Sequence, residues 1–265
     1  MNLEKENYDK FLKLLVREFS EKYPNVCLFG YGSLFNSNGR FNPGISDIDG
    51  GIILDSGVIT PKNEILKISR AYSRALRKSG LVKLRNRPDF NLMDRCTNQD
   101  GRFLSYRKTY IEHIKKFGMV LSGPNYLGEM SELEDREESL IDAAFVFRSL
   151  RNKVLNCYDI LSCDSERFSE FVVGSMNKVS KFPKKLLEIV DANTIEIDRL
   201  KSQNKLEEVL ETEFPMLSFI NQLVLKPSKK IYKFLSDREK AIHSLGYSLE
   251  TVEIIVNAFL KKFLR

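Results

Sequence analysis

Hydrophobic residues recur along the chain with two different periods, and the change of period divides the sequence. Up to about Pro124, short apolar runs alternate with amphipathic stretches, and Gly, Pro and Asn separate them. Beyond Pro124 the apolar residues follow the spacing of helices. We therefore expect an α/β (α+β) protein, with a small mixed-sheet domain over residues 1–124 and an all-α helical bundle over residues 125–265.

The first half predicts a small sheet flanked by helices. Its helical patterns cover residues 5–22, 60–80 and 106–117. Its strand-like runs cover residues 26–29, 47–54, 81–84, 89–93 and 119–121, the last as an edge strand.

The second half predicts a series of helices. Ser131 and Glu134 form a capping box ahead of a helix that runs towards Leu161. Further helices are expected over residues 165–178, 195–212, 216–225, 229–245 and 248–263. The expected helix breaks are Pro183, Pro215, Pro227 and Gly246.

Composition predicts a cytoplasmic protein. No apolar run approaches the roughly 18 residues of a membrane span, and the charged first residues lack a signal-peptide core. The four Cys form no CxxC pair, so neither a zinc knuckle nor a disulfide framework is indicated. A net charge of +6 favours anionic ligands. With only two His, both His-based metal centres and Ser-His-Asp hydrolysis are poorly provided for.

Two acids share one face of the predicted strand at residues 47–54. Because strand residues i and i+2 point to the same side, Asp47 and Asp49 would project their carboxylates together. Such a pair repels unless a cation compensates. Mg²⁺ suits this role because it takes oxygen ligands and shares them with substrate phosphates. Upstream, Gly32 lets the backbone approach a phosphate, and Ser33 offers an amide and a hydroxyl.

A third acid, Asp89, begins a predicted strand in which Phe90 and Leu92 face away from Asn91. A lone carboxylate there is poorly explained by packing, because its burial is expensive. Beside a metal site it can accept the proton of an attacking hydroxyl. Asp94 is the competing candidate for this base, although alternation places it on the opposite face.

Three segments of the first half together resemble the nucleotidyltransferase superfamily related to DNA polymerase β. They are Phe29-Gly30-Tyr31-Gly32-Ser33, Ser46-Asp47-Ile48-Asp49 and Arg87-Pro88-Asp89-Phe90. The pattern of that family is a Gly-Gly or Gly-Ser turn, a loop, an acid–apolar–acid strand and a later acidic strand. The resemblance covers roughly residues 26–121. Within the superfamily, the chain is similar to small prokaryotic and antibiotic-modifying members.

The resemblance implies a Mg²⁺-dependent transferase with two metal ions. It would transfer a nucleoside monophosphate from an NTP donor to a hydroxyl or amine and release pyrophosphate. The implied metal-binding and catalytic residues are Asp47, Asp49 and Asp89. The implied nucleotide-binding residues are Gly32 and Ser33. Arg85 and Arg87 flank the third acidic strand, and we expect Arg87 to bind triphosphate oxygens.

A small molecule such as an antibiotic is the acceptor that we expect, and a protein side chain or an RNA end is the alternative. A nucleic-acid partner is possible but not indicated, because the basic segment at residues 62–116 lacks interleaved aromatic residues for base stacking. The rival from another class is an antitoxin-type or other regulatory module on the same fold. No membrane partner is expected, and the pattern predicts no particular oligomeric state.

Two segments of the second half resemble the Arg-x4-His signature of HEPN-type ribonucleases. Arg238 and His243 have this spacing, whereas Arg151 is followed by Asn156 where the His should stand. Without that His the latter segment lacks a general base. The Arg238–His243 segment lacks the usual polar residues of the signature, and we therefore interpret both segments as ordinary helix residues.

Overall fold

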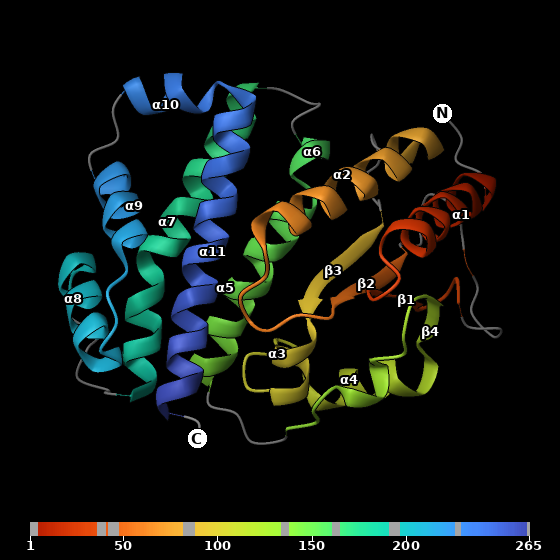
Figure 1. Ribbon diagram of the computed structural model, residues 1–265, viewed down its shortest axis with the longest axis horizontal. Coiled ribbons are helices and arrows are strands. Elements are labelled where there is room, and N and C mark those ends of the chain that lie inside the picture. The colour runs from red at the N-terminus through yellow and green to blue at the C-terminus, as the bar shows by residue number, and fades with distance from the viewer. Residues whose placement is uncertain are drawn as a thin grey trace. The chain divides into compact units, whose positions relative to one another are not determined.

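The computed structural model describes residues 5–35, 41, 48–81, 88–133, 138–160, 165–190, 197–225 and 229–263. Over these residues the chain combines a small four-stranded sheet with many helices, so the predicted α/β class is confirmed (Figure 1). It divides into two compact units. The first is Met1–Gly57 with Lys67–Glu134, and the second is Val58–Leu66 with Asp135–Arg265.

The sequence-based boundary at Pro124 stays a prediction. Tyr126, Leu127 and Met130, which follow it, are buried in the core of the first unit. The elements up to this point are α1 (Lys5–Lys22), β1 (Cys27–Tyr31), β2 (Asp49–Leu54), α2 (Lys62–Ser79), β3 (Asp89–Asp94), α3 (Arg95–Asp100), α4 (Lys108–Phe117), β4 (Met119–Ser122) and the 3₁₀ helix η2 (Leu127–Glu129).

The sheet has the strand order β3-β2-β1-β4 and is mixed. β1 runs antiparallel to β2 and to β4, whereas β2 and β3 are parallel. β4 is the edge strand that the sequence predicts. The strand predicted at residues 81–84 is not found at Leu81, and residues 82–84 lie outside the described part of the chain.

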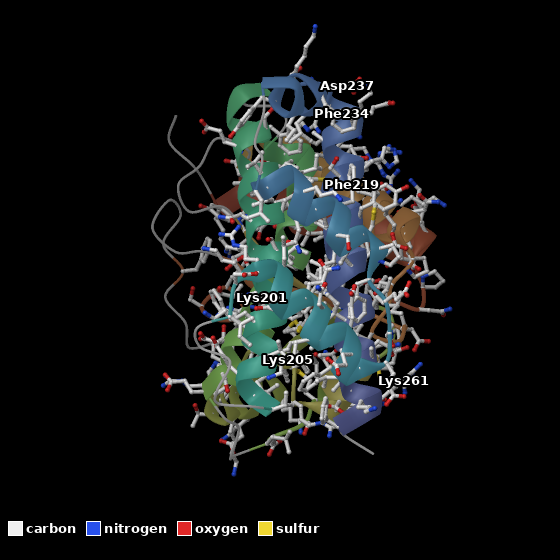
Figure 2. All side chains as sticks on the ribbon, turned by 90° about the vertical axis from the view of Figure 1, so that its left-hand side faces the viewer. Lys201, Lys205, Phe219, Phe234, Asp237 and Lys261 are labelled. Carbon is white, nitrogen blue, oxygen red and sulfur yellow. The ribbon has the colours of Figure 1, made fainter. Side chains whose placement is uncertain are left out.

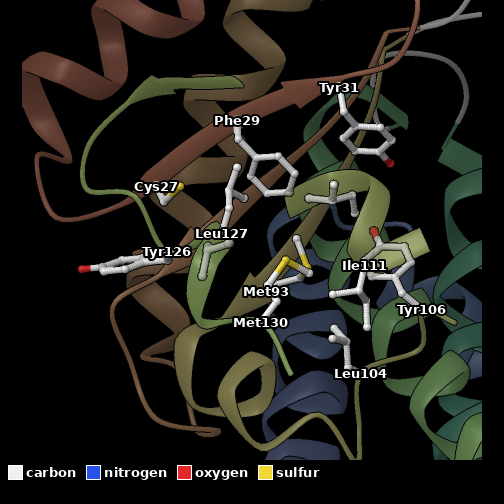
Figure 3. Packing of buried hydrophobic residues seen from close by; sticks show 12 residues of the cluster. Cys27, Phe29, Tyr31, Met93, Leu104, Tyr106, Ile111, Tyr126, Leu127 and Met130 are labelled. Atoms are coloured by element: carbon white, nitrogen blue, oxygen red, sulfur yellow. The ribbon is translucent and has the colours of Figure 1, made fainter. Parts of the chain in front are cut away.

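Each face of the sheet is buried by different elements. On one face the ring of Phe90 from β3 packs against Phe11 of α1 and Tyr72 of α2, with all three ring centroids 5.8–5.9 Å apart. The opposite face is covered by a cluster that includes α4 and η2 (Figure 3). Its buried members are Cys27, Phe29, Tyr31, Ile53, Met93, Leu104, Tyr106, Ile111, Ile114, Tyr126, Leu127 and Met130.

The second unit is helical. After the part of α2 that belongs to it, its elements are α5 (Glu138–Leu155), α6 (Cys157–Ile160), α7 (Ser165–Val190), α8 (Arg199–Leu210), α9 (Pro215–Leu225), α10 (Lys229–Leu235) and α11 (Arg238–Phe263). α7 packs against α5, α8, α9 and α11. The predicted bundle is therefore present.

Two expected helix breaks are wrong. α7 continues through Pro183, and the buried side chains of Phe182 and Leu186 beside it show why: tertiary packing there outweighs the roughly 3 kcal/mol penalty of an interior proline. α11 likewise continues through Gly246. A Cβ at Gly246 would stand 2.9 Å from Cδ of Lys62, so this glycine serves close packing rather than a helix end.

The predicted capping box at Ser131 is also wrong as a helix start. Residues 131–133 are not helical, and the Ser131 amide donates instead to the carbonyl of Asn98 at 2.8 Å. α5 begins at Glu138, and Glu134 lies outside the described residues.

A buried ion pair joins three segments of the second unit. Nη2 of Arg151 on α5 lies 2.9 Å from Oε1 of Glu253 on α11, and the two side chains are 4% and 1% exposed. Arg151 also donates to the carbonyl of Val58 at 3.0 Å, and the amide of Thr60 donates to Glu253 at 2.9 Å. The pair therefore ties the segment before α2 to α5 and α11, and Arg151 has a structural role.

The surface of the second unit formed by its later helices carries exposed apolar and basic side chains (Figure 2). Phe219 on α9 and Phe234 on α10 are about half exposed. Lys201 and Lys205 belong to α8, and Lys261 belongs to α11. Among the described residues, none of the helices combines the length and apolar character that a membrane span requires.

Removal of one partner of the buried Arg151–Glu253 pair should strongly destabilise the fold. Arg151→Met would leave the carboxylate of Glu253 buried without its cation, so we expect the free energy of unfolding to fall by about 3–5 kcal/mol. Urea denaturation followed by circular dichroism measures this change. The control is Lys185→Met, which removes an ion pair with Asp142 whose side chains are 34% and 63% exposed. That variant should lose less than about 1 kcal/mol, and equal losses in the two variants would contradict the structural role of Arg151.

Candidate functional site

The parallel pairing of β2 with β3 places two carboxylates next to each other. Asp49 is the register partner of Asp89, and both residues stand at the first position of their strands. Paired residues of neighbouring strands project to the same face, so the two side chains point to the same side of the sheet. Asp49 is half-buried and Asp89 is exposed. The two carboxylates therefore stand at the start of β2 and β3, and that of Asp89 is accessible to solvent.

The start of β3 is fixed by hydrogen bonds and by packing. The amide of Asp89 donates to the carbonyl of Ile48 at 2.8 Å, and the fully buried hydroxyl of Tyr72 donates to the carbonyl of Pro88 at 2.7 Å. Phe90, directly after Asp89, is fully buried. Tyr72 belongs to the apolar stripe of its helix, so its sequence pattern signals a core residue and gives no sign of this hydrogen bond.

The turn after β1 approaches Asp49 closely. Gly32 has a φ of +89°, a conformation that favours glycine, and a Cβ there would stand 3.2 Å from Oδ2 of Asp49. The carbonyl of Gly32 accepts from the amide of Phe35 at 3.2 Å, which closes the turn around half-buried Ser33. The predicted phosphate-binding turn and Asp49 are therefore adjacent.

Asp49 has a tyrosine on β1 as its neighbour, on the side away from Asp89. Tyr31 is the antiparallel register partner of Asp49 and accepts a hydrogen bond of 2.6 Å from the hydroxyl of Tyr110 on α4. Burial is the main cause that raises the pKa of Tyr31 above its ordinary value, and the neighbouring Tyr106, Tyr110 and Asp49 add to it. Tyr31 therefore stays neutral beside the carboxylate. Sequence reasoning missed Tyr110, whose position follows only from the packing of α4 on the sheet.

Asp94, the competing candidate for the base, lies at the far end of β3, where its register partner is Leu54. It is fully buried, and its Oδ1 accepts the amide of Thr97 at 2.7 Å as the N-cap of α3. Asp94 and Asp89 are five residues apart along a strand, which is about 16 Å. Asp94 therefore has a structural role away from the Asp49–Asp89 pair.

Two of the predicted site residues, Asp47 and Arg87, lie outside the described residues. Within the described part of the chain, no three or more His, Cys, Asp or Glu side chains gather as metal ligands. The two carboxylates that the structure does place together are hard oxygen donors, which fits Mg²⁺. Asp49 also lies next to the Gly32 turn, where a side chain would crowd its carboxylate. These two oxygen donors are thus compatible with Mg²⁺.

Comparisons with known proteins give one distant likeness. No protein-family model matches the chain, and no curated protein matches it. Among solved structures, the chain is similar to the spectinomycin adenyltransferase AAD(9) from Enterococcus faecialis, crystallised with ATP and spectinomycin. The identity is 15% and the TM-score 0.31, with 92% of this chain and 98% of the other covered. A TM-score this low does not establish a common fold.

The geometry of Gly32 predicts a specific intolerance of a side chain. In Gly32→Ala the backbone would keep an unfavourable φ and the new methyl group would press on Oδ2 of Asp49. We expect the free energy of unfolding to fall by about 1–2 kcal/mol. The control is Gly57→Ala, where φ is not positive and a Cβ would meet nothing within 4 Å. Its change should stay within about 0.5 kcal/mol. Chemical denaturation compares the two, and a neutral Gly32→Ala would contradict the turn described here.

Proposed function

We propose that this protein is a Mg²⁺-dependent nucleotidyltransferase. It would transfer a nucleoside monophosphate from an NTP to a hydroxyl or amine acceptor, which we expect to be a small molecule, and release pyrophosphate. The observation that carries the proposal is the register of β2 and β3, which places Asp49 beside Asp89 with the Gly32 turn against Asp49. Two carboxylates opposite each other at the first positions of neighbouring strands are unfavourable without a cation, so the pair favours a metal site.

Asp49 and Asp89, with Asp47 from the preceding residues, would hold the metal. When bound, Mg²⁺ supplies Lewis-acid stabilisation of the oxygens that enter and leave during phosphoryl transfer. Because two carboxylates side by side repel each other, a bound cation would also stabilise them in this position.

Asp89 would act as the base because it is the exposed member of the pair. It accepts the proton of the acceptor hydroxyl or amine, whose oxygen or nitrogen forms a new bond to the α-phosphorus. The bond from the α-phosphorus to the bridging oxygen of the β-phosphate breaks, and pyrophosphate leaves with that electron pair. The amide and hydroxyl of Ser33, next to Gly32, would hold phosphate oxygens, and Arg87 would add charge-assisted hydrogen bonds.

An assay with labelled donors tests the reaction itself. The purified protein is incubated with each α-labelled NTP, Mg²⁺ and a panel of hydroxylated antibiotics, tRNA and cell lysate. We expect one acceptor to gain the mass of a nucleoside monophosphate, with pyrophosphate released in equal amount. Pyrophosphate release without acceptor labelling, or no turnover with any NTP, would contradict the proposal.

Three Asp→Asn variants separate the roles of the acids. Asp49→Asn should abolish Mg²⁺-dependent nucleotide binding in calorimetry, because it removes a ligand from the centre of the site. Asp89→Asn should keep much of the binding but lose a factor of roughly 10²–10⁴ in turnover, the usual contribution of a positioned base. Asp94→Asn is the matched control, since Asn is about as good an N-cap as Asp, and should keep the parent turnover. The reverse pattern, with Asp94→Asn inactive and Asp89→Asn active, would exclude this assignment.

A further inference from the structure

Two lysines of the second unit donate hydrogen bonds to serine hydroxyls on the neighbouring helix. Nζ of Lys153 on α5 donates to Oγ of Ser175 on α7 at 2.9 Å. Nζ of Lys178 on α7 donates in the opposite direction, to Oγ of Ser149 on α5, at 3.2 Å. Both residue pairs belong to the interface of α5 with α7. Each hydroxyl therefore fixes the position of one ammonium group.

The two ammonium groups differ in exposure, since Lys178 is exposed and only Lys153 is partly withdrawn from water. Lys153 is half-buried and lies 4.7 Å above the ring of Phe171, yet no described carboxylate forms an ion pair with Lys153 or Lys178. An ammonium group has three N–H donors, and the serine uses one of them. At least one further donor on each lysine is thus available to a ligand.

The neighbouring positive charge makes this arrangement unfavourable. Burial, and after it the charge of Lys178, lowers the pKa of Lys153 to about 8. Serine hydroxyls cannot relieve this repulsion because they carry no charge. By contrast Lys185, further along α7, reaches a carboxylate, that of Asp142, at 2.9 Å.

The positions of the two lysines on their helices place their ammonium groups on the order of one helical turn apart along the interface of α5 with α7. Residues 149 and 153 on α5, and residues 175 and 178 on α7, are each about one helical turn apart, on the order of 5 Å along the helices. Two charge-assisted N–H···O bonds of about 2.8 Å to one tetrahedral ion can bridge a gap of this size. Gly174, four residues before Lys178 on α7, is exposed, and a Cβ there would meet nothing within 4 Å.

We propose that Lys153 and Lys178, held by Ser175 and Ser149, form a binding site for a tetrahedral oxyanion of the phosphate type. The site lies within the helical unit and is independent of the proposed catalytic carboxylates. Its ligand is inorganic phosphate or the phosphate group of a small ester.

The test follows the two lysines directly by NMR of protein labelled at lysine ¹³Cε. Lys153→Arg and Lys178→Arg assign their signals. Phosphate and sulfate are titrated against chloride at equal ionic strength, and sulfate serves because its charge is constant over the range in which Lys153 titrates. We expect saturable shifts at both lysines and a rise in the pKa of Lys153 from about 8 towards its ordinary value. The signal of Lys185 should stay in place.

A matched pair of substitutions at Gly174 tests the same site without removing either lysine. Gly174→Glu stands four residues before Lys178, the spacing at which Glu and Lys pair on a helix, so it should occupy the site and weaken phosphate binding about tenfold or more, as expected for loss of a charge-assisted hydrogen bond. Gly174→Gln should bind phosphate as the parent does.

The outcomes are distinct. Shifts that chloride reproduces at equal ionic strength, or unchanged phosphate affinity in Gly174→Glu, would overturn the proposal. Tighter binding of adenosine monophosphate than of inorganic phosphate would assign the site to a phosphate ester, and the reverse to the free ion. Repeating the titration in Asp49→Asn keeps this result separate from any binding at the carboxylates.

Discussion

The parallel pairing of β2 with β3 is the constraint on which the candidate site depends. The strand residues after Asp49 and Asp89 are buried, and Ile52, Ile53, Leu92 and Met93 fill the two faces of the sheet in alternation. A shift of the register by one residue would turn every one of these side chains to the wrong face. The core therefore fixes the register, and the register brings the two carboxylates together. Packing far from the site thus determines its geometry.

The sequence predicts this arrangement better than it predicts the helix ends. Alternation alone places Asp89 opposite to Phe90 and on the face of Met93, because the period of a strand leaves no freedom. The breaks expected at Pro183 and Gly246 fail because local propensity competes with burial, and burial of the neighbouring side chains prevails. The hydrogen bond of Tyr72 joins it to Pro88, which is distant in sequence, and the cap that Asp94 gives to α3 belongs to a helix too short to show periodicity. No sequence pattern predicts either interaction.

Two positively charged side chains in the helical unit, Arg151 and Lys153, have different kinds of partner. Arg151 is almost completely buried and is matched by Glu253 and a backbone carbonyl, which is the usual requirement for a charge inside a protein. Lys153 is also partly buried, but its protein partners are the hydroxyl of Ser175 and the ring of Phe171. The charge of Lys178 adds to burial in lowering the pKa of Lys153. This contrast between Arg151 and Lys153 is the basis of the anion site proposed above.

The central claim is that Asp49 and Asp89, the first residues of β2 and β3, bind a metal-bound nucleotide. A crystal structure of the protein with Mn²⁺ and a non-hydrolysable nucleoside triphosphate tests it most directly, because Mn²⁺ is located by its anomalous scattering and also binds carboxylates. Our account predicts anomalous peaks between the carboxylates of Asp49 and Asp89, with phosphate oxygens at the Gly32 turn. Nucleotide and metal bound elsewhere, with these two carboxylates contacting neither, would contradict it.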